Sequence, residues 1–461
     1  MLIERSFAQK LLMILAAAAV FMDYLDTSIV SIALPAISES FGSGSAMSSW
    51  VMTSYLLALG STLLLFGKLA DRTGLQRVIF TTGFVLFTVA SFLCGISTDI
   101  TSLIGFRVFQ GVAAAMMVAT ATMLITLHLP KHLQPIGMGV IATAGGAALA
   151  LGPGIGGVLT QFISWHWIFF INIPVGIVGV LVALFLIPKP DPADLPVREK
   201  PFDSLGAVYL AGTLVALLAG LELGVSVGWS AEVVLLLAVS PVLAYLFLRR
   251  EFRHPDPILS ARLLLNRTVM WAAVSTLCIT LVYLGVIYVM PFLLTETYRL
   301  PTAVAGAVML LPPVAMALVG IPAGAFVRRC GCMRLCNAAA ALLAAGMVLL
   351  ATAVVAASLP LMGVGLLLVG LGMGLNEGPS IQRITVHSPL ELQGSSGGLI
   401  FTVMNVGCVL GVALFSVAAA TASGSASVYT PEGVAVACVV GLAVAVIAFV
   451  TSKLACDTVK C

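Results

Sequence analysis

The sequence predicts an all-α membrane protein that crosses the bilayer fourteen times. Of its 461 residues, 60% are hydrophobic and 9% are charged, whereas a soluble domain carries about 25% charged residues. Apolar runs of about 18 residues or more recur along the whole chain, and nearly all Lys and Arg residues lie on one side of them. These observations exclude a soluble enzyme, a nucleic-acid-binding protein and a disordered chain.

Each predicted span is a helix. A transmembrane β-barrel would need strands of about 10 residues with alternating polarity, and the apolar runs here are longer and uniformly hydrophobic. A helix satisfies its own backbone hydrogen bonds in lipid, as no other open structure does. In chain order, the predicted spans are residues 11–34, 47–67, 78–97, 101–127, 136–160, 166–187, 203–223, 230–248, 268–292, 302–327, 335–357, 359–382, 395–420 and 432–452.

The distribution of basic residues predicts the orientation of the spans. Because the number of spans is even, both termini lie on the same side of the membrane. Of the 22 Lys and Arg residues, Arg299 falls on the other side, Arg107 lies inside a span, and all the rest share the side of the termini. By the positive-inside rule, both termini are cytoplasmic in a multi-pass plasma-membrane protein.

The chain is predicted to contain two related halves with an insertion between them. Gly67–Gly74 and Gly324–Gly331 share glycine, arginine and glycine at equal spacing, 257 residues apart. Duplicated helical halves are how secondary transporters build a site that opens alternately to each side. The Pro-rich segment Pro188–Pro201 marks the start of the insertion. The expected parts are a six-helix bundle at 1–188, a linker with two inserted helices at 189–267, and a second six-helix bundle at 268–461.

Three motifs resemble those of the major facilitator superfamily. Gly67–Arg77 is similar to the family's loop signature, although Leu75 and Gln76 occupy positions where basic residues are usual. Arg107–Gly111 is similar to the family's R-x-x-q-G motif, and Gly152–Gly157 is similar to the G-P-x-x-G-G motif of its antiporters. The resemblance implies two six-helix bundles of the major facilitator fold plus two inserted helices.

Two further motifs resemble those of the fourteen-helix drug:proton antiporters within that superfamily. Leu25–Pro35 is similar to the motif L-D-x-T-I-V-N-V-A-L-P. Trp165–Gly176 is similar to W-R-W-I-F-x-I-N-x-P-x-G, with His166 in place of Arg. All five motifs occur in family order and agree with the independent span count, whereas the second half resembles the family mainly in hydropathy and in the loop repeat. The resemblance implies multidrug efflux.

The resemblance also places conformational gating in two glycine-containing segments. In the first, Asp71 is expected at the N-terminus of a neighbouring helix, where the helix dipole favours an anion; solvated loop charges are the alternative. In the second, the glycines allow a bend and close packing, and simple small-residue packing is the alternative. The candidate gating residues are Gly67, Asp71, Arg72, Gly74, Gly152, Pro153, Gly156 and Gly157.

Ionisable residues inside spans form the candidate proton-coupling site. Asp23 and Asp26 are about 4.5 Å apart along the helix axis, and two such carboxylates in a low dielectric do not both ionise easily. Asp26 matches the family motif and is expected to carry the proton, while for Asp23 a structural hydrogen bond is the alternative. The family fold places Arg107 beside Asp26, as a pair that opens when the proton arrives or as a static one.

A second set of residues is expected to bind substrate. Glu377 lies in a Gly- and Pro-rich stretch, where a broken helix lets backbone line a cavity. It is expected to attract a cationic substrate or to carry a second proton, unless it reaches water at the end of its span. Asn405 occupies the position of a family glutamine, and Met404 stands where an arginine is common, which disfavours an anionic substrate. Phe21 and Met22 are candidate cavity residues, with packing as the alternative.

We therefore predict a proton-coupled antiporter that exports small amphiphilic, cationic compounds by alternating access. One alternative is a transporter of a specific metabolite or lipid on the same fold. Another is a non-transporting receptor or scaffold, against which the cost of the buried charges argues. The chain lacks a P-loop pattern, so ATP is not expected to drive it directly. We expect no enzyme activity, no cofactor or metal, and a monomer whose partners are protons, a small-molecule substrate and the lipid bilayer, without nucleic acid.

Overall fold

The computed structural model describes residues 6–43, 45–189, 202–226, 228–423 and 430–455. These residues are mostly helical, and no strand occurs among them. Within them, 14 helical segments are long and apolar enough to cross a membrane. Each predicted span overlaps one of these segments, so the predicted all-α fold with fourteen spans is confirmed.

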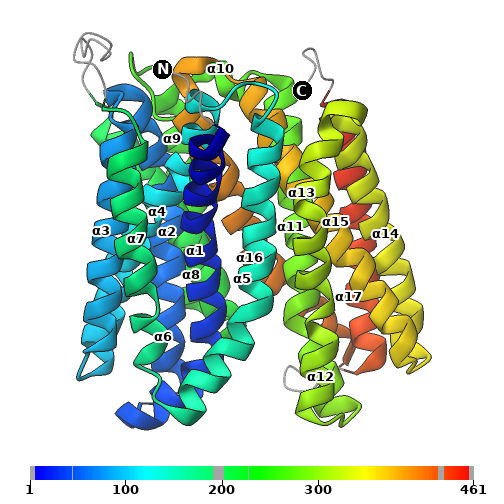
Figure 1. The fold of residues 1–461 in the computed structure, drawn as a ribbon. Helices are drawn as coiled ribbons and strands as arrows, with labels where there is room; N and C mark the ends of the chain where they lie inside the picture. The colour runs from blue at the N-terminus through cyan, green and yellow to red at the C-terminus, as the bar shows by residue number, and fades with distance from the viewer. Residues whose placement is uncertain (1–5, 44, 190–201, 227, 424–429, 456–461) are drawn as a thin grey trace. The chain divides into compact units, whose positions relative to one another are not determined.

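The chain divides into two compact units, each drawn from several parts of the sequence. Unit 1 consists of Met1–Gly137, Ala148–Leu265 and Ser388–Thr402, and unit 2 of Met138–Ala147, Asn266–His387 and Val403–Cys461. The unit boundaries fall inside α5 and α16, so these two helices contribute to both. The elements, coloured along the chain in Figure 1, are α1 Ser6–Phe41, α2 Ser45–Thr73, α3 Gln76–Gly95, α4 Ile100–His128, α5 Gln134–Phe162, α6 Trp167–Phe170, α7 Asn172–Leu186, α8 Ser204–Ser226, α9 Ala231–Glu251, α10 Ala261–Leu264, α11 Arg267–Phe292, η2 Leu293–Thr297, α12 Thr302–Met309, α13 Leu311–Cys330, α14 Cys332–Val355, α15 Leu359–Val386, η3 Leu390–Leu392, α16 Gln393–Ser423 and α17 Pro431–Leu454.

Two predicted spans are interrupted near one end. The span predicted at 166–187 consists of α6 and α7, with Ile171 between them, and the span predicted at 302–327 consists of α12 and α13, separated at Leu310. In each case a proline follows the break within three residues, Pro174 and Pro312. Proline lacks the backbone N–H and its ring clashes with the preceding turn of a helix, which explains why the helix restarts there.

In unit 1, α4 is the most deeply buried span. It packs against α1, α2 and α3, and 83% of its most apolar stretch is buried. The helix begins after Asp99, whose carboxylate accepts a hydrogen bond from the Ser102 backbone N–H at 2.8 Å. This bond to the charged form holds the pKa of Asp99 below its ordinary value. At Gly111, a Cβ would overlap with the Tyr55 carbonyl oxygen of α2, so glycine permits the close approach that joins the two helices.

The predicted inserted helices are α8 and α9, and both belong to unit 1. α8 packs against α2 and against α9. In α9, 17% of the most apolar stretch is buried, the smallest share among the described spans. Most of its apolar side chains therefore face outward. The predicted division of the chain at residues 188 and 267 stays a prediction.

In unit 2, α15 packs against α11, α13 and α14, and α17 packs against α11 and α14. Glycines on α15 allow close contact with α13, since a Cβ at Gly370 would overlap with the Pro312 carbonyl oxygen and one at Gly374 would lie 2.7 Å from that of Met316. Small residues at such contacts are typical of helix packing in membranes.

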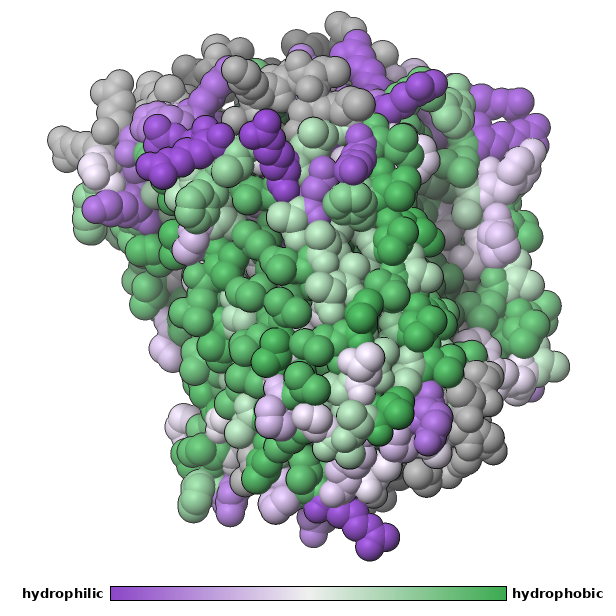
Figure 2. Space-filling model, turned by 90° about the vertical axis from the view of Figure 1, so that its right-hand side faces the viewer, coloured by the Kyte–Doolittle hydropathy of each residue, from purple (hydrophilic) through white to green (hydrophobic). Residues whose placement is uncertain are grey.

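The molecular surface matches a lipid environment. The face shown in Figure 2 is hydrophobic across its broad middle zone, and its hydrophilic side chains gather towards the two ends. Large apolar side chains are exposed on many spans, among them Val348 of α14 and Val446 of α17. Such a band is what contact with the hydrocarbon core of a bilayer requires.

Candidate functional site

A buried ion pair lies in the interior of unit 1. Arg107 of α4 has no exposed surface and pairs through Nη1 with Oδ2 of Asp26 on α1, whose side chain is equally buried. Arg107 Nη1 also donates to Gln110 Oε1 at 2.7 Å, and its Nε donates to the Val51 carbonyl oxygen of α2 at 2.9 Å. The structure thus places Arg107 against Asp26, as the motif resemblance implied, and ties three helices together.

Two amide side chains meet the other oxygen of the same carboxylate. Gln110 Nε2 and Asn172 Nδ2 donate to Asp26 Oδ1 at 3.0 and 3.2 Å. Both amides also donate to the Ser91 hydroxyl of α3, at 2.7 and 3.2 Å. The negative charge of Asp26 is therefore met by a guanidinium and two N–H donors, and the network draws in α3 and α7.

Aromatic rings enclose the guanidinium. The Arg107 carbon Cζ lies 4.1 Å from the centroid of the Tyr55 ring and 5.8 Å from that of Phe169, within the range of cation–π attraction. Its Nη2 has no hydrogen-bond partner among the described residues. One donor of the buried cation is consequently available to a group that enters the site.

Asp23 has a different environment, one turn away on α1. Its Oδ1 accepts a hydrogen bond from the Tyr55 hydroxyl at 2.5 Å, and its side chain is 4% exposed. Tyr55 therefore links the two acidic residues: its hydroxyl donates to Asp23, and its ring lies against Arg107, the partner of Asp26. Two buried carboxylates thus lie near one cation, and the hydrogen bond to Asp23 comes from a neutral hydroxyl.

A second arrangement lies at the end of unit 1 where α2 and α9 end and α16 begins, which we call the basic end. Asp71 of α2 accepts hydrogen bonds at 2.6 Å from the backbone N–H groups of Gly394 and Ser395, one to each carboxylate oxygen. These are orphan donors at the start of α16, and the helix dipole favours the anion there. A Cβ at Gly67 would overlap with the Gly394 carbonyl oxygen, so this glycine sets the helix separation.

The same end holds an ion-pair cluster that the sequence did not predict. Asp256, in the segment between α9 and α10, pairs with Lys68 at 2.5 Å and with Arg72 at 2.7 Å. Arg72 also lies over the Phe202 ring, with 5.6 Å from Cζ to the centroid. In the basic segment that follows α9, Asp256 is the one acidic residue before α11, and this isolation could have marked it as a candidate partner for basic residues. The segment after the inserted helices is thus attached to the predicted gating motif.

The remaining predicted gating residues differ in their packing. A Cβ at Gly152 would overlap with the Ser28 hydroxyl, and one at Gly156 would lie 3.1 Å from the Ile29 carbonyl oxygen. Both therefore let α5 approach α1, with Pro153 between them inside the helix. Gly157 faces open space, so close packing does not require it. Gly74 has φ +65 just after the end of α2, a conformation that favours glycine.

The acidic candidate of unit 2 lies inside α15. Glu377 and its neighbour Asn376 have no exposed surface, so Glu377 does not lie at the water-facing end of its span. Ser380, one turn later, donates to Asn376 Oδ1 at 2.8 Å. Asn405 of α16 has its side-chain oxygen buried without a hydrogen-bond partner among the described residues, and the preceding Met404 is 4% exposed.

Arg383 is one of the basic residues that the sequence places on the side of the termini, just beyond the span expected at 359–382, and in the structure the helix continues past it. Arg383 lies in the last turn of α15 and is 1% exposed. Its guanidinium donates to the Ser452 hydroxyl at 3.2 Å, to the Ser452 carbonyl oxygen at 3.1 Å and to the Ala455 carbonyl oxygen. The unsatisfied carbonyls at the end of α17 attract a cation, which explains its burial.

Phe21 and Met22 take up different positions on α1. Met22 is 1% exposed, and Phe21 packs against a hydrophobic cluster that includes Leu25 and Ile29. For Phe21 the structure therefore shows packing. Neither residue lines the pockets described here or below. No group of three or more metal-ligating side chains occurs in the described part of the chain.

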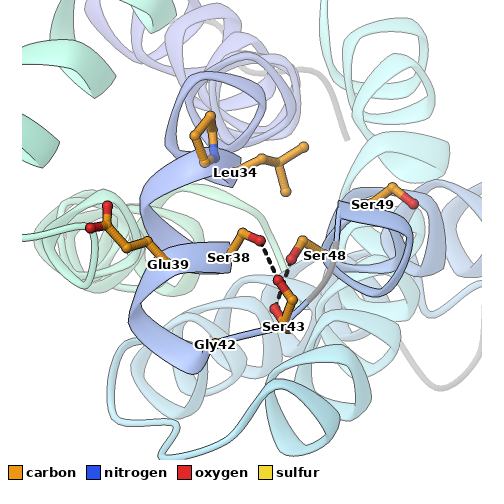
Figure 3. Close-up of a pocket in the computed structure, with 8 residues that line it drawn as sticks. Leu34, Ser38, Glu39, Gly42, Ser43, Ser48 and Ser49 are labelled. Carbon is orange, nitrogen blue, oxygen red and sulfur yellow. Dashed lines mark hydrogen bonds between the residues drawn. The ribbon is translucent and has the colours of Figure 1, made fainter.

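A pocket of about 640 Å³ opens between α1 and α2, at the opposite end of unit 1 from the basic end. Figure 3 shows Ser38 and Glu39 projecting from α1 and Ser48 from α2, with Ser43 between the helices. Ser38 donates to the Ser43 carbonyl oxygen at 2.6 Å, and the Ser43 and Ser48 hydroxyls lie 2.8 Å apart. Ser38 is roughly 18 Å along α1 from Asp26, so this pocket is separate from the buried ion pair.

Comparisons with known proteins agree with this architecture. The model of the Major Facilitator Superfamily matches residues 16–412. The riboflavin transporter RibZ of Clostridioides difficile (strain 630) is 31% identical over 408 residues, which cover 88% of this chain and 87% of that protein. A tetracenomycin C resistance and export protein of Streptomyces glaucescens is 32% identical over 412 residues, covering 88% and 75%. The human organic anion transporter MFSD10 (TETRAN) shares the fold, with a TM-score of 0.70, 17% identity, and coverage of 97% and 99%.

The matched region contains the structural features described above. It begins before Asp26 in α1 and ends in α16, so it includes the Asp26–Arg107 pair, the Asp71 contact with α16, and Glu377. The two relatives named from sequence comparison match across most of their own length. This chain therefore belongs to the major facilitator superfamily of transporters.

Proposed function

We propose that the protein is a proton-coupled antiporter that exports small amphiphilic cations by alternating access. The observation that carries the proposal is the buried Asp26–Arg107 ion pair, with the second buried carboxylate of Asp23 one turn away. Ionisable groups at this depth are costly and serve function by default. A transporter that exchanges protons for substrate needs a buried ionisable group to carry the proton. A scaffold protein has no function that would offset the free energy of burying one.

In the proposed cycle, a proton that arrives at the site weakens the attraction between Asp26 and Arg107. Neutralising Asp26 leaves the guanidinium without its counter-charge, and the free donor of Arg107 Nη2 then favours any incoming acceptor. Asp23 is the second candidate, because protonating it breaks no ion pair and leaves Tyr55 as its partner. Coupling at Asp26 requires the pair to open, and coupling at Asp23 does not.

Gating is proposed at the basic end. The bonds from Gly394 and Ser395 to Asp71 hold the start of α16 against α2, and Asp256 holds Lys68 and Arg72. A conformation in which α16 moves away from α2 must break the Asp71 bonds. Arg72 and Gly74 are proposed to act at the same contact. Gly152, Pro153, Gly156 and Gly157 are proposed to let α5 bend as it moves.

Glu377 is proposed to attract the cationic part of the substrate. It is fully buried, which makes a charge there costly unless a cation or a proton compensates it. Glu377→Gln is expected to weaken transport of cations more than of neutral compounds, with exposed Glu391→Gln as the matched control. Equal loss for both substrate types would assign Glu377 a proton-carrying or structural role instead. Asn405, Met22 and Phe21 are the further proposed substrate contacts.

A second candidate function is transport of one specific metabolite. The riboflavin transporter from Clostridioides difficile matches nearly the whole chain, while the Streptomyces glaucescens relative is named for export and resistance. A saturable response to one compound, without competition from unrelated organic cations, would favour the metabolite reading. Competition among unrelated cations would favour multidrug efflux.

The test is flux in proteoliposomes with an imposed pH gradient. The wild-type protein is expected to move a fluorescent organic cation against its gradient when protons flow the other way, and Asp26→Asn is expected to abolish this while retaining weak substrate binding. A folded Asp26→Asn protein with wild-type proton-driven flux would place coupling elsewhere, at Asp23 first. Substrate flux that is the same with and without the pH gradient would refute proton antiport.

We also propose the plasma membrane as the location, with both termini cytoplasmic and the protein acting as a monomer. The basic residues of unit 1 gather at the basic end, which the positive-inside rule assigns to the cytoplasm. Reporter fusions in the loop at Lys131 should then read cytoplasmic and those in the loop at Arg299 external. The opposite result at either site would reverse the topology, and light scattering of the purified protein would test the monomer.

A further inference from the structure

The inserted helices carry a basic pocket beside an apolar surface. A pocket of about 250 Å³ lies where α9 ends, lined by Tyr209 of α8 and by residues of α9 and the segment after it. Its lining includes three arginines and a histidine within six residues of sequence. The lining residues are Tyr209, Leu246, Arg249, Arg250, Arg253, His254 and Pro255.

The positive charge of this pocket is only partly compensated. Arg250 donates to Asp203 at 2.5 Å, and the same Asp203 oxygen accepts the Gly206 backbone N–H at 2.8 Å, so this pair belongs to the start of α8. Arg249 and Arg253 are exposed and form no ion pair with any described residue. Two guanidinium groups therefore face the pocket region without a carboxylate partner.

The surface next to the pocket is apolar and exposed. On α9, Val242, Tyr245 and Leu248 are 58%, 62% and 43% exposed, and Phe252 just beyond it is 59% exposed. On α8, Val208 beside Tyr209 is 63% exposed. In a membrane-spanning pair these side chains contact acyl chains. The basic pocket thus lies at the point where an apolar helix surface meets the charged end of the spans.

We propose that this pocket binds the phosphate-bearing headgroup of an anionic phospholipid. Arginine forks recognise phosphate oxygens in a bidentate manner, and basic pockets between membrane-spanning helices on the charged side of a bilayer suit such headgroups. The exposed side chains of Val242, Tyr245 and Leu248 offer the adjoining acyl chains a surface. A soluble phosphate has no apolar part that could contact this surface, whereas a phospholipid has both a phosphate and acyl chains.

If the end of α2 has the proposed gating role, the bound lipid would also stabilise its contact with the segment that follows α9. Pro255, at the edge of the pocket, directly precedes Asp256, which holds Lys68 and Arg72 of α2. A headgroup that immobilises Arg253 and His254 restrains the segment on which Asp256 lies. The site therefore offers a route by which bilayer composition changes the stability of the basic end.

The experiment measures lipid retention by the full-length protein. Purified protein is titrated with phosphatidylglycerol or with phosphatidylcholine, and the bound lipid is counted by native mass spectrometry. Each of two arginines near an anionic lipid is worth about fivefold in affinity, so the paired variant Arg249→Gln with Arg253→Gln is expected to bind phosphatidylglycerol about 25-fold more weakly. The matched control is Arg328→Gln with Arg329→Gln, two exposed arginines in the last turn of α13 that do not line the pocket at the end of α9.

Four results would overturn the proposal. Equal loss in the α13 control would show that basic charge in general attracts the lipid, and equal retention of phosphatidylcholine would show that the acyl chains alone bind. Displacement of phosphatidylglycerol by inorganic phosphate at millimolar concentration would show a soluble-anion site. If the Gln variant melts early, Arg249→Lys with Arg253→Lys keeps the charge but loses the bidentate fork, and unchanged lipid affinity in that folded variant would refute phosphate recognition by these arginines.

Discussion

Replacing Asp26 with Asn is expected to destabilise the folded protein by about 3–5 kcal/mol, the cost of removing one partner of a buried ion pair. Both oxygens of Asp26 accept hydrogen bonds, one from Arg107 and the other from Gln110 and Asn172. An asparagine side chain has one oxygen, so in either orientation its NH₂ group faces a donor. The substitution therefore leaves a buried cation uncompensated and creates a donor–donor contact.

Asp23→Asn is the matched control on the same helix. The Asp23 side chain accepts from the Tyr55 hydroxyl, and the oxygen of an asparagine accepts the same bond. The expected loss is about 1 kcal/mol or less, the value of exchanging a charged for a neutral acceptor. The two variants remove a carboxylate from the same part of α1, so their difference reports the ion pair together with the amide contacts of Asp26.

A second substitution separates lost charge from lost shape. Arg107→Gln in the Asp26→Asn background removes the buried cation, and the double variant is expected to lose less stability than the sum of the two single variants, with a coupling free energy on the order of 2 kcal/mol. The measurement is equilibrium unfolding in detergent for the wild type, both single variants and the double variant. If Asp26→Asn unfolds together with Asp23→Asn, or if Arg107→Gln adds its full cost to that of Asp26→Asn, the ion pair does not hold this site and the reasoning fails.

Three further predictions concern other contacts. Asp256→Asn should weaken the attachment of the α9–α10 segment by about 0.5–1 kcal/mol, because the pairs with Lys68 and Arg72 are partly exposed; faster hydrogen exchange in residues 252–260 would show it, and unchanged exchange would contradict it. Gly67→Leu should abolish flux without preventing membrane insertion, because a side chain there collides with the Gly394 backbone; normal flux would mean that α2 and α16 never need to approach. Arg383→Gln should lower the free energy of unfolding by about 1.5–3 kcal/mol, the value of hydrogen bonds to a charged group; an unchanged melting temperature would show that the end of α17 needs no cation.

The sequence predicted the fourteen spans because hydropathy is a local property, read over about 20 residues. It predicted the meeting of Arg107 and Asp26 only through the family resemblance, since periodicity alone does not say which helices are neighbours. Gln110 and Asn172 were both inside recognised motifs, yet their hydrogen bonds to Asp26 follow from the packing of α4 and α7 against α1. A buried carboxylate that pairs with a cation also needs neutral hydrogen-bond donors around it. On that basis, the polar side chains inside the motifs could have been expected to contact Asp26.

The contacts between segments far apart in the chain could not be predicted from the sequence. Arg72 and Asp256 are 184 residues apart, and no local pattern records their pairing. Arg383 was placed on the side of the termini, and nothing in the sequence near it indicates that its partners are the carbonyl groups of another helix terminus. In both cases hydropathy locates a charge along the chain but does not indicate which group the charge contacts.

The strength of the proposed latch at the basic end, which is the contact of Asp71 with the start of α16, can be compared with the energy available to open it. Asp71 makes two charge-assisted hydrogen bonds to α16, each worth about 1.5–3 kcal/mol, so breaking both costs about 3–6 kcal/mol. One proton that crosses a membrane potential supplies about 2.3 kcal/mol per 100 mV, and a pH difference of one adds about 1.4 kcal/mol. The two quantities are of the same size, so on the proposed mechanism one proton suffices to open the latch when the two bonds lie near the lower end of that range. Asp71→Asn, which turns two charge-assisted bonds into one neutral bond, should therefore favour the conformation open at the basic end, and accessibility of single cysteines placed along α16 from Ser395 to Thr402 should rise. Unchanged accessibility would show that the latch is held by the packing of Gly67 against Gly394 rather than by the carboxylate.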